Sequence, residues 1–400
     1  MYRNVRGEPS PPQQFTQIVI AVALVTFSQG LLIPLLATLQ SGHISSILNS
    51  LSTTDLYTGL VLAMFVVERV LRWSGMRNTV VWALCLGIVM ILLLGMTQNV
   101  WLWLVFRFVF GLCLGTIHFT TQTWLGKLTD TDRRGRQMAL YGMATGVGFS
   151  VGPLCLNTVS LSRAIPFVLT GLALTISVVL ISRLPNNGLV VTNAEQHQDS
   201  PKISTRHLYR LVLPAVLMPF VFGFMESALN GDLPLYAKDV GLPLTVMSMA
   251  LAAFVIGSLV LQYTLGYLSD RWGRRRILVS CSLIGAVIFA VTPFVDSTFG
   301  FTMMFALAGG FVGTLFSLSL AFLSDLVPSN RLHQANRLAM IHFGTGMTLG
   351  PILAGGAITW LMPNSLFWSL SVLYILYVVI GLLVRRTFPL AEETKRTRSV

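Results

Sequence analysis

Apolar runs of roughly twenty residues recur along the whole chain, and no other feature of the sequence constrains the fold as strongly. A helix of that length crosses about 30 Å of bilayer hydrocarbon. Only 10% of the 400 residues are charged and 54% are hydrophobic, which leaves too little polar surface to cover a soluble protein. The sequence therefore predicts an all-α membrane protein.

Twelve such runs are predicted to be transmembrane helices. They lie near residues 17–38, 54–71, 79–97, 100–124, 138–161, 164–182, 208–230, 245–268, 277–295, 299–324, 337–361 and 365–384. A polar connection, residues 184–207, separates six runs from six and is predicted to be a linker. The chain is thus expected to consist of two six-helix halves, residues 1–183 and 208–400.

Lysine and arginine predict the orientation, because loops rich in them stay on the cytoplasmic side during insertion. With the N-terminus inside, the inner segments hold 24 of the 27 basic residues, whereas the outer loops hold only Arg163 and Lys238. Both termini and the linker are therefore predicted to be cytoplasmic. The first run lacks a following cleavage site and is interpreted as a helix, not a signal peptide. The short loops favour a bacterial inner membrane.

Several other classes of protein fit this sequence poorly. The net charge of +12 does not indicate nucleic-acid binding, because the basic residues lie between apolar runs and not on one face of a soluble domain. The four cysteines all lie inside apolar runs, where a thiol behaves as a small hydrophobe. A membrane sensor would need an output domain, and a lipid hydrolase would need a nucleophile with a base nearby. We expect no enzymatic activity, cofactor or metal site, and we expect a monomer.

The chain matches itself at an offset of 198 residues. The matching residues are mainly glycines: Gly75 with Gly273, Gly111 with Gly309, Gly115 with Gly313, Gly148 with Gly346, Gly152 with Gly350, and also Pro153 with Pro351 and Arg133 with Arg331. Shared hydrophobicity does not explain matches of this kind, so the halves are predicted to be duplicates. Two halves related by an axis along the membrane normal place a substrate site between them near the midplane.

The connection between the eighth and ninth runs reads GYLSDRWGRRR from Gly266 to Arg276. It resembles the loop signature of the major facilitator superfamily, and the resemblance extends over essentially the whole chain. It implies a twelve-helix transporter that works by alternating access. The residues that carry the signature are Gly266, Asp270, Arg271, Gly273 and Arg274.

We interpret this loop as an inner gate. Pseudo-symmetry is expected to place Asp270 near the start of the fifth run, where Arg133 and Arg136 lie beside a positive helix N-terminus. The alternative is that the arginines are only topology signals. In the first half, Arg72 stands where Asp270 does, so that copy has lost the acid, and Glu68 is the candidate to replace it.

Within the fifth run, the segment from Gly142 to Pro153 resembles the glycine-rich motif of drug–proton antiporters in the same superfamily. The trailing glycine pair of that motif is absent here, and the second half keeps the fuller copy. Small residues at four-residue spacing also let two helices approach closely. Either an antiport-specific role or close packing explains Gly148, Gly152, Pro153, Gly346, Gly350 and Pro351.

The fourth run carries a polar stripe at helical spacing, namely Arg107, Gly111, Gly115, His118 and Gln122. This stripe is predicted to line the cavity. Ionisable residues at membrane depth are costly, which makes Arg107 a functional candidate. It also resembles the fourth-span arginine of proton-coupled antiporters. The alternative is a structural clamp on carbonyl groups of the first run near Ser28 and Gln29.

Two further residues lie inside apolar runs of the second half. Glu226, in the outer part of the seventh run, is predicted to exchange protons as access alternates; the alternative is a solvated residue at the outer mouth. Asp232 is expected in the loop that follows. His342, in the eleventh run, is predicted to be a cavity hydrogen-bonding group or a proton stop, with a packed histidine as the alternative.

The predicted function is proton-coupled export of small amphipathic compounds. Its partners are the small-molecule substrate, protons and the lipid bilayer, and its cavity residues are Gln29, Arg107, His118, Glu226 and His342. The alternative is a symporter or facilitator for a small polar or anionic metabolite. The first run carries no acid, and a buried arginine without such an acid suits an anion.

Overall fold

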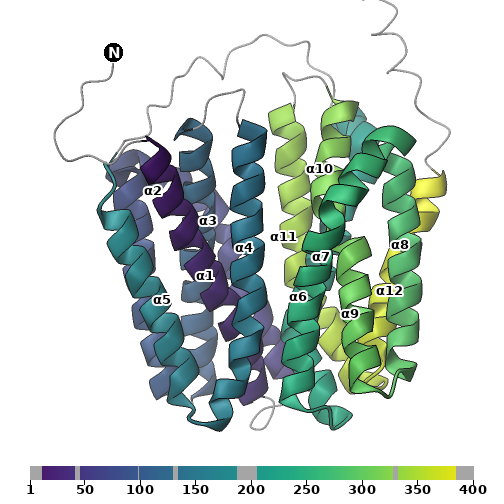
Figure 1. Ribbon diagram of the computed structural model, residues 1–400, viewed down its shortest axis with the longest axis horizontal. Helices are drawn as coiled ribbons and strands as arrows, with labels where there is room; N and C mark the ends of the chain where they lie inside the picture. Colours follow the sequence, from purple (N-terminus) through teal and green to yellow (C-terminus); the bar gives the residue numbers. More distant parts are fainter. Residues whose placement is uncertain are drawn as a thin grey trace, which may run out of the picture. The chain divides into compact units, whose positions relative to one another are not determined.

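The computed structural model describes residues 11–40, 46–97, 99–128, 134–186, 205–327 and 332–383. Every regular element within these ranges is a helix (Figure 1). Ten of these described helices are long and apolar enough to cross a membrane.

The N-terminal part of the chain forms α1 (Pro11–Gln40), α2 (Ser46–Met96), α3 (Val100–Leu128), α4 (Arg134–Leu154), the short 3-10 helix η2 (Cys155–Ser160) and α5 (Ala164–Ser182). The C-terminal part forms α6 (Thr205–Asp239), α7 (Leu244–Trp272), α8 (Arg274–Val291), the 3-10 helix η4 (Thr292–Phe294), α9 (Thr298–Val312), α10 (Leu315–Leu326), α11 (Leu332–Trp360) and α12 (Ser365–Leu383).

Helix α2 supplies two of the predicted spans. It bends at Gly75, whose φ of 75° and ψ of 169° are not helical, so the second and third runs form two helical segments joined at one residue. Helix α4 supplies the fifth run and is not among the ten candidate spans. With these two helices included, each of the twelve predicted runs is helical, and the predicted fold class is confirmed.

Several boundaries differ from the sequence prediction, and the differences at the tenth run and at α6 bear on the fold. The tenth run is interrupted at Gly313 and Thr314, which separate α9 from α10. Helix α6 continues past the predicted end at residue 230 to Asp239. The added turns bury Leu233 and Tyr236, so apolar burial continues the helix through a segment whose composition indicated a loop.

The chain divides into two compact units, each described by itself. Unit 1 comprises residues 1–191 and 229–256, and unit 2 comprises residues 192–228 and 257–400. Unit 1 therefore includes the C-terminal end of α6 and the N-terminal part of α7. The predicted division at residues 184–207 stays a prediction.

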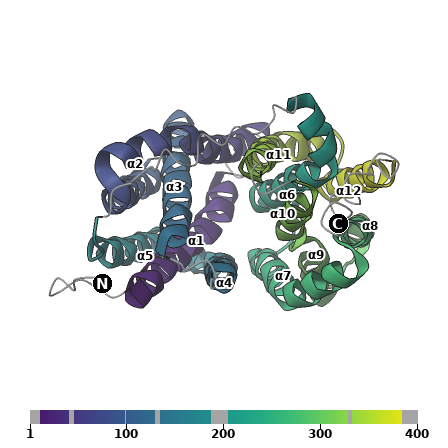
Figure 2. The ribbon, with the colours of Figure 1, turned by 90° about the horizontal axis from the view of Figure 1, so that it is seen from above.

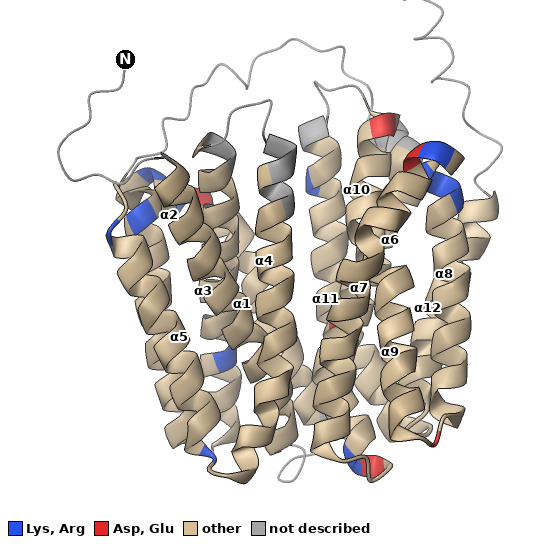
Figure 3. Ribbon diagram, viewed as in Figure 1, with Lys and Arg blue, Asp and Glu red and all other residues tan. Residues whose placement is uncertain are grey.

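Packing within each unit is between neighbouring helices. In unit 1, α1 packs against α4 and α5, and α2 packs against α3 and α5 (Figure 2). In unit 2, α8 packs against α9 and α12, and α11 packs against α12. Charged residues gather at the helix ends and leave the middles of the helices mostly uncharged (Figure 3). This is the distribution that a lipid bilayer requires of helices that cross it.

Candidate functional site

Arg107 of α3 is completely buried in unit 1, with 0% of its side chain exposed. Its Nη1 donates to the Ser52 hydroxyl of α2 at 2.7 Å, and its Nη2 lies 3.5 Å from the Ile33 carbonyl oxygen of α1. The guanidinium thus joins three helices. The alternative prediction is that Arg107 holds carbonyl groups of the first run near Ser28 and Gln29. The structure shows such a carbonyl contact, but one helical turn later, at Ile33.

Asp55 of α2 is the acid that accompanies Arg107. It is half-buried, and its charge acts on the guanidinium at longer range than the direct contacts with Ser52 and Ile33. The sequence analysis missed Asp55, because it stands at the start of the second run, where an acid is typical of a solvated helix end. The available signal was its spacing of three from Ser52, which puts both side chains on one face of the helix.

Gln29 and His118, both predicted for the cavity, are brought together. The His118 Nε2 lies 3.1 Å from the Gln29 Oε1, which links α3 to α1. The glycines of the predicted stripe have a different role: a Cβ at Gly111 or Gly115 would meet a carbonyl oxygen of α2. That part of the stripe packs against α2 and does not line a cavity, because glycine permits close helix approach.

His342 of α11 has a partner on each ring nitrogen in unit 2. The Nδ1 lies 2.8 Å from the Leu338 carbonyl oxygen, and the Nε2 lies 3.0 Å from the Tyr209 hydroxyl of α6. Because a carbonyl only accepts, Nδ1 carries a proton and, in the neutral ring, Nε2 accepts from Tyr209. Glu226 lies half-buried in the same unit on α6. Both residues therefore lie within the helices, as predicted.

Asp232 corrects a sequence expectation. It is not in a loop: it lies inside α6, is 0% exposed, and accepts a hydrogen bond from the Ser50 hydroxyl of α2 at 2.7 Å. A second polar contact in unit 1 joins Asn157 of η2 to the Ser248 hydroxyl of α7 at 3.1 Å. Polar side chains therefore tie the ends of α6 and α7 that belong to unit 1 to the N-terminal helices.

The signature loop of unit 2 holds a small ion network. Gly273 has a φ of 92° and caps the N-terminus of α8, and Asp270 and Arg274 lie 3.2 Å apart across it. Arg274 also contacts Asp325 at the end of α10, at 2.6 Å, and Arg271 lies 4.5 Å from the ring centre of Tyr267. The sequence analysis missed Asp325, which follows the tenth predicted run directly.

The predicted gate partners of Asp270 lie outside the described structure. Arg133 is not among the described residues, and the side chain of Arg136 is not described either. A gate between these arginines and Asp270 stays a prediction. Gly266, the first glycine of the signature, has open space where a Cβ would stand.

The glycine motifs bring two pairs of helices into close contact. In unit 1, a Cβ at Gly148 would meet the Ala23 carbonyl oxygen of α1, and Gly152 of α4 packs on α1 one turn later. In unit 2, Gly346 and Gly350 of α11 pack on the backbone of α6 in the same way. The prolines after them are buried: Pro153 precedes the end of α4, and Pro351 lies inside α11.

Two duplicated sets of membrane-spanning helices with polar groups inside them define a secondary transporter fold. The family model of the Major Facilitator Superfamily matches residues 18–225 and 215–399. The chain therefore belongs to the major facilitator superfamily, whose members are transporters and not enzymes.

Named relatives agree with this assignment. The chain is 32% identical over 361 residues to the uncharacterised MFS-type transporter YfkF of Bacillus subtilis (strain 168), covering 89% of this chain and 92% of YfkF. It is 27% identical over 350 residues to the uncharacterised MFS-type transporter YcaD of Escherichia coli (strain K12 / DH10B), covering 86% of each.

Solved structures share the fold at low identity. The nucleoside transporter NupG matches with a TM-score of 0.70 and 13% identity, over 94% of this chain and 100% of that chain. A bacterial homologue of the human lysosomal transporter Spinster matches with a TM-score of 0.69 and 11% identity, over 96% of this chain and 98% of that chain. The protein is thus a multi-pass membrane transporter that binds a small-molecule substrate.

Proposed function

We propose that the protein couples proton entry to export of small amphipathic compounds by alternating access. It acts as a monomer in a bacterial inner membrane, with both termini in the cytoplasm. The observation that supports this most directly is the buried guanidinium of Arg107 where α1, α2 and α3 meet, with the half-buried carboxylate of Asp55 within electrostatic range. Below, "the Arg107–Asp55 pair" means these two side chains.

The pair can link a proton to a change of conformation. Arg107 keeps its charge at membrane depth, whereas Asp55 can be charged or neutral. A charge without a counter-charge is costly in a low-dielectric interior. Protonation of Asp55 removes the counter-charge of Arg107 and so favours a conformation in which the guanidinium is better solvated or paired. Because the guanidinium contacts both α1 and α2, the change in free energy acts on the packing of those helices.

The pair also bears on the substrate. The sequence favours an anionic substrate as an alternative, because the first run has no acid to balance the charge of Arg107. Asp55 supplies that balance from α2, which weakens the case for an anion and favours neutral or amphipathic compounds. The resemblance of the Gly148 region to the motif of drug–proton antiporters points the same way. Glu226 and His342 are proposed as further proton-exchanging groups.

A second candidate is uptake of a small polar metabolite. It is favoured by the Gln29–His118 hydrogen bond, which places an uncharged polar pair between α1 and α3 where exporters of cationic drugs carry an acid. Such a pair suits hydroxyl or amide groups of a substrate.

Accumulation of fluorescent lipophilic compounds distinguishes the two candidates. Cells that express the protein are compared with empty cells, with and without a protonophore. We expect lower accumulation with the wild type, and we expect both the protonophore and Asp55→Asn to restore it to the empty-cell level. Asp296→Asn is the matched control, because Asp296 is an exposed carboxylate between α8 and α9.

Equal accumulation in expressing and empty cells would overturn drug export and favour metabolite uptake. Lower accumulation that persists in Asp55→Asn would retain export and reject the Arg107–Asp55 pair as the coupling site. Membrane extracts are blotted for each variant so that loss of protein is not mistaken for loss of transport.

A further inference from the structure

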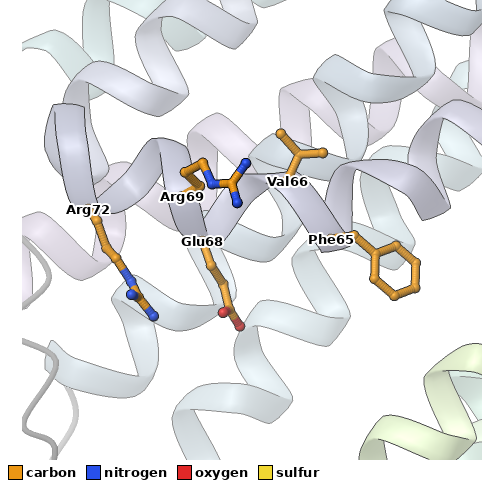
Figure 4. A pocket seen from close by; sticks show the side chains of 5 residues that line it. All are labelled: Phe65, Val66, Glu68, Arg69 and Arg72. Atoms are coloured by element: carbon orange, nitrogen blue, oxygen red, sulfur yellow. The ribbon is translucent and has the colours of Figure 1, made fainter.

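A hollow of about 290 Å³ lies on α2 just before its bend at Gly75 (Figure 4). Its lining comes entirely from α2 and consists of Phe65, Val66, Glu68, Arg69 and Arg72. The predicted orientation places this end of the second span at the cytoplasmic surface. The hollow therefore lies where phospholipid headgroups meet the protein.

One edge of the hollow is apolar and faces outward. Phe65 is 61% exposed and Val66 is 55% exposed, and Leu62 continues this face one turn earlier. Exposed apolar side chains at helical spacing are typical of a surface covered by acyl chains. In the same α2, Trp73 is 80% exposed and stacks edge-on with Trp82 at 6.0 Å. Exposed tryptophans mark the headgroup level of a membrane.

The other edge of the hollow is positively charged. Arg69 and Arg72 are both exposed, and neither takes part in the ion pairs of Arg274 with Asp270 and Asp325. Glu68 supplies one negative charge, and its side chain extends in the same direction as that of Arg72 (Figure 4). Two guanidinium groups against one carboxylate leave the hollow with a net positive charge.

The repeat explains why this surface is cationic. Three charged residues build the ion network of unit 2, and none of them keeps its charge in the first half: Asp270 corresponds to Arg72, Arg274 to Met76, and Asp325 to Lys127. The first copy has therefore exchanged its acids for bases. Glu68 is the one carboxylate that lines the hollow with these arginines, and the positions equivalent to Asp270 and Asp325 are both basic.

We propose that this hollow binds one anionic phospholipid of the cytoplasmic leaflet, through its phosphate. Arg69 and Arg72 donate to the phosphate oxygens, which suit the planar guanidinium fork. The acyl chains lie over Phe65 and Val66. Glu68 repels a second negative charge, so the site selects a phosphodiester with a single charge, as in phosphatidylglycerol, over a phosphomonoester.

Thermal unfolding of the purified protein in detergent, with phosphatidylglycerol or phosphatidylcholine added, tests the site. Native mass spectrometry measures the lipid bound. We expect phosphatidylglycerol to bind more tightly than phosphatidylcholine and to raise the unfolding temperature. The double change Arg69→Gln with Arg72→Gln should weaken its binding about 30-fold. The matched control, Arg271→Gln with Arg276→Gln, removes two exposed arginines of the other loop and should leave binding unchanged.

Three results would overturn the proposal. Equal binding of phosphatidylglycerol by the wild type and the Arg69/Arg72 variant would show that the two arginines do not bind the phosphate. Equal stabilisation by glycerol phosphate alone would assign the site to a free anion and not to a lipid. Tighter binding of phosphatidylethanolamine, abolished by Glu68→Gln, would make the ligand zwitterionic. If the double variant does not fold, the single change Arg72→Gln replaces it, with a smaller loss expected in the same assay.

Discussion

The turn at Gly75 in α2 and the turn at Gly273 between α7 and α8 are two copies of one structure. Both glycines have a positive φ, 75° and 92°. An arginine two residues later donates to a carbonyl near the end of the last helix of its half: Arg77 to Leu184 at 3.4 Å, and Arg275 to Gly381. The backbone of the turn and its tie to the sixth or twelfth span are thus the same in both.

Apart from these two arginines, the charges around the two turns differ. In unit 2, Arg274 joins Asp270 to Asp325, whereas the first copy carries Arg72 where Asp270 stands. In place of an ion network, the first turn is held by Asn186, whose Nδ2 donates to the Ser74 carbonyl oxygen at 3.2 Å. The shape of the turn is therefore independent of the ion network, and the network is free to take another role.

The largest expected effect is a loss of stability when Gly75 or Gly273 is replaced by alanine, and the loss should differ between the two glycines. A non-glycine residue at positive φ costs about 1–2 kcal/mol, so Gly75→Ala and Gly273→Ala both lower the unfolding temperature. Gly75→Ala should lower it more, because the new Cβ would lie 2.6 Å from the Asn186 Oδ1 and displace the side chain that holds the turn, whereas Gly273 has open space. Thermal unfolding in detergent measures both, with Gly142→Ala in open space on α4 as the control. Equal losses at the two turns would contradict the role given to Asn186.

The arginine ties are expected to be equivalent. Arg77→Gln and Arg275→Gln each remove a charge-assisted hydrogen bond to a carbonyl oxygen, at a cost of about 1–2 kcal/mol. The same unfolding measurement should give similar losses for the two variants. A loss at one turn alone would show that the two copies are not tied to their halves in the same way.

The smallest effect is expected in the ion network. Its side chains are partly exposed, so Arg274→Gln should cost no more than about 1 kcal/mol. A double-mutant cycle with Asp325→Asn measures the coupling, which should fall as salt is raised. A coupling that salt leaves unchanged would mean that the pair is shielded from water and has a structural role.

Much of the fold was predictable, because hydrophobic length and glycine spacing are local properties of the sequence. The twelve spans followed from apolar runs, and the 198-residue offset placed Gly152 and Gly350 in equivalent positions. The structure adds that Gly59 and Gly257, also 198 residues apart, both pack against a neighbouring backbone. The second and third runs were predicted as separate spans, and the structure joins them in α2 at the bend at Gly75.

One physical reason explains why two acids were missed and a third, Asp232, was expected in a loop. Asp55, Asp232 and Asp325 all stand near a predicted span end, where composition alone favours a solvated residue. The residues with which they interact, Arg107, Ser50 and Arg274, lie on other helices, 51 or more residues away in the sequence. Such pairings depend on how helices pack, which the sequence of one helix does not specify. The cavity residues Glu226 and His342 stay predictions.

Proton movement driven by substrate is the most direct test of the central claim, that the Arg107–Asp55 pair couples transport to protons. Purified protein is reconstituted into vesicles that contain a pH-sensitive dye and an acidic interior, and a compound found in the accumulation assay is added outside. The account predicts alkalinisation of the interior by the wild type and by Asp296→Asn, and none by Asp55→Asn. Alkalinisation at the wild-type rate in Asp55→Asn would contradict it.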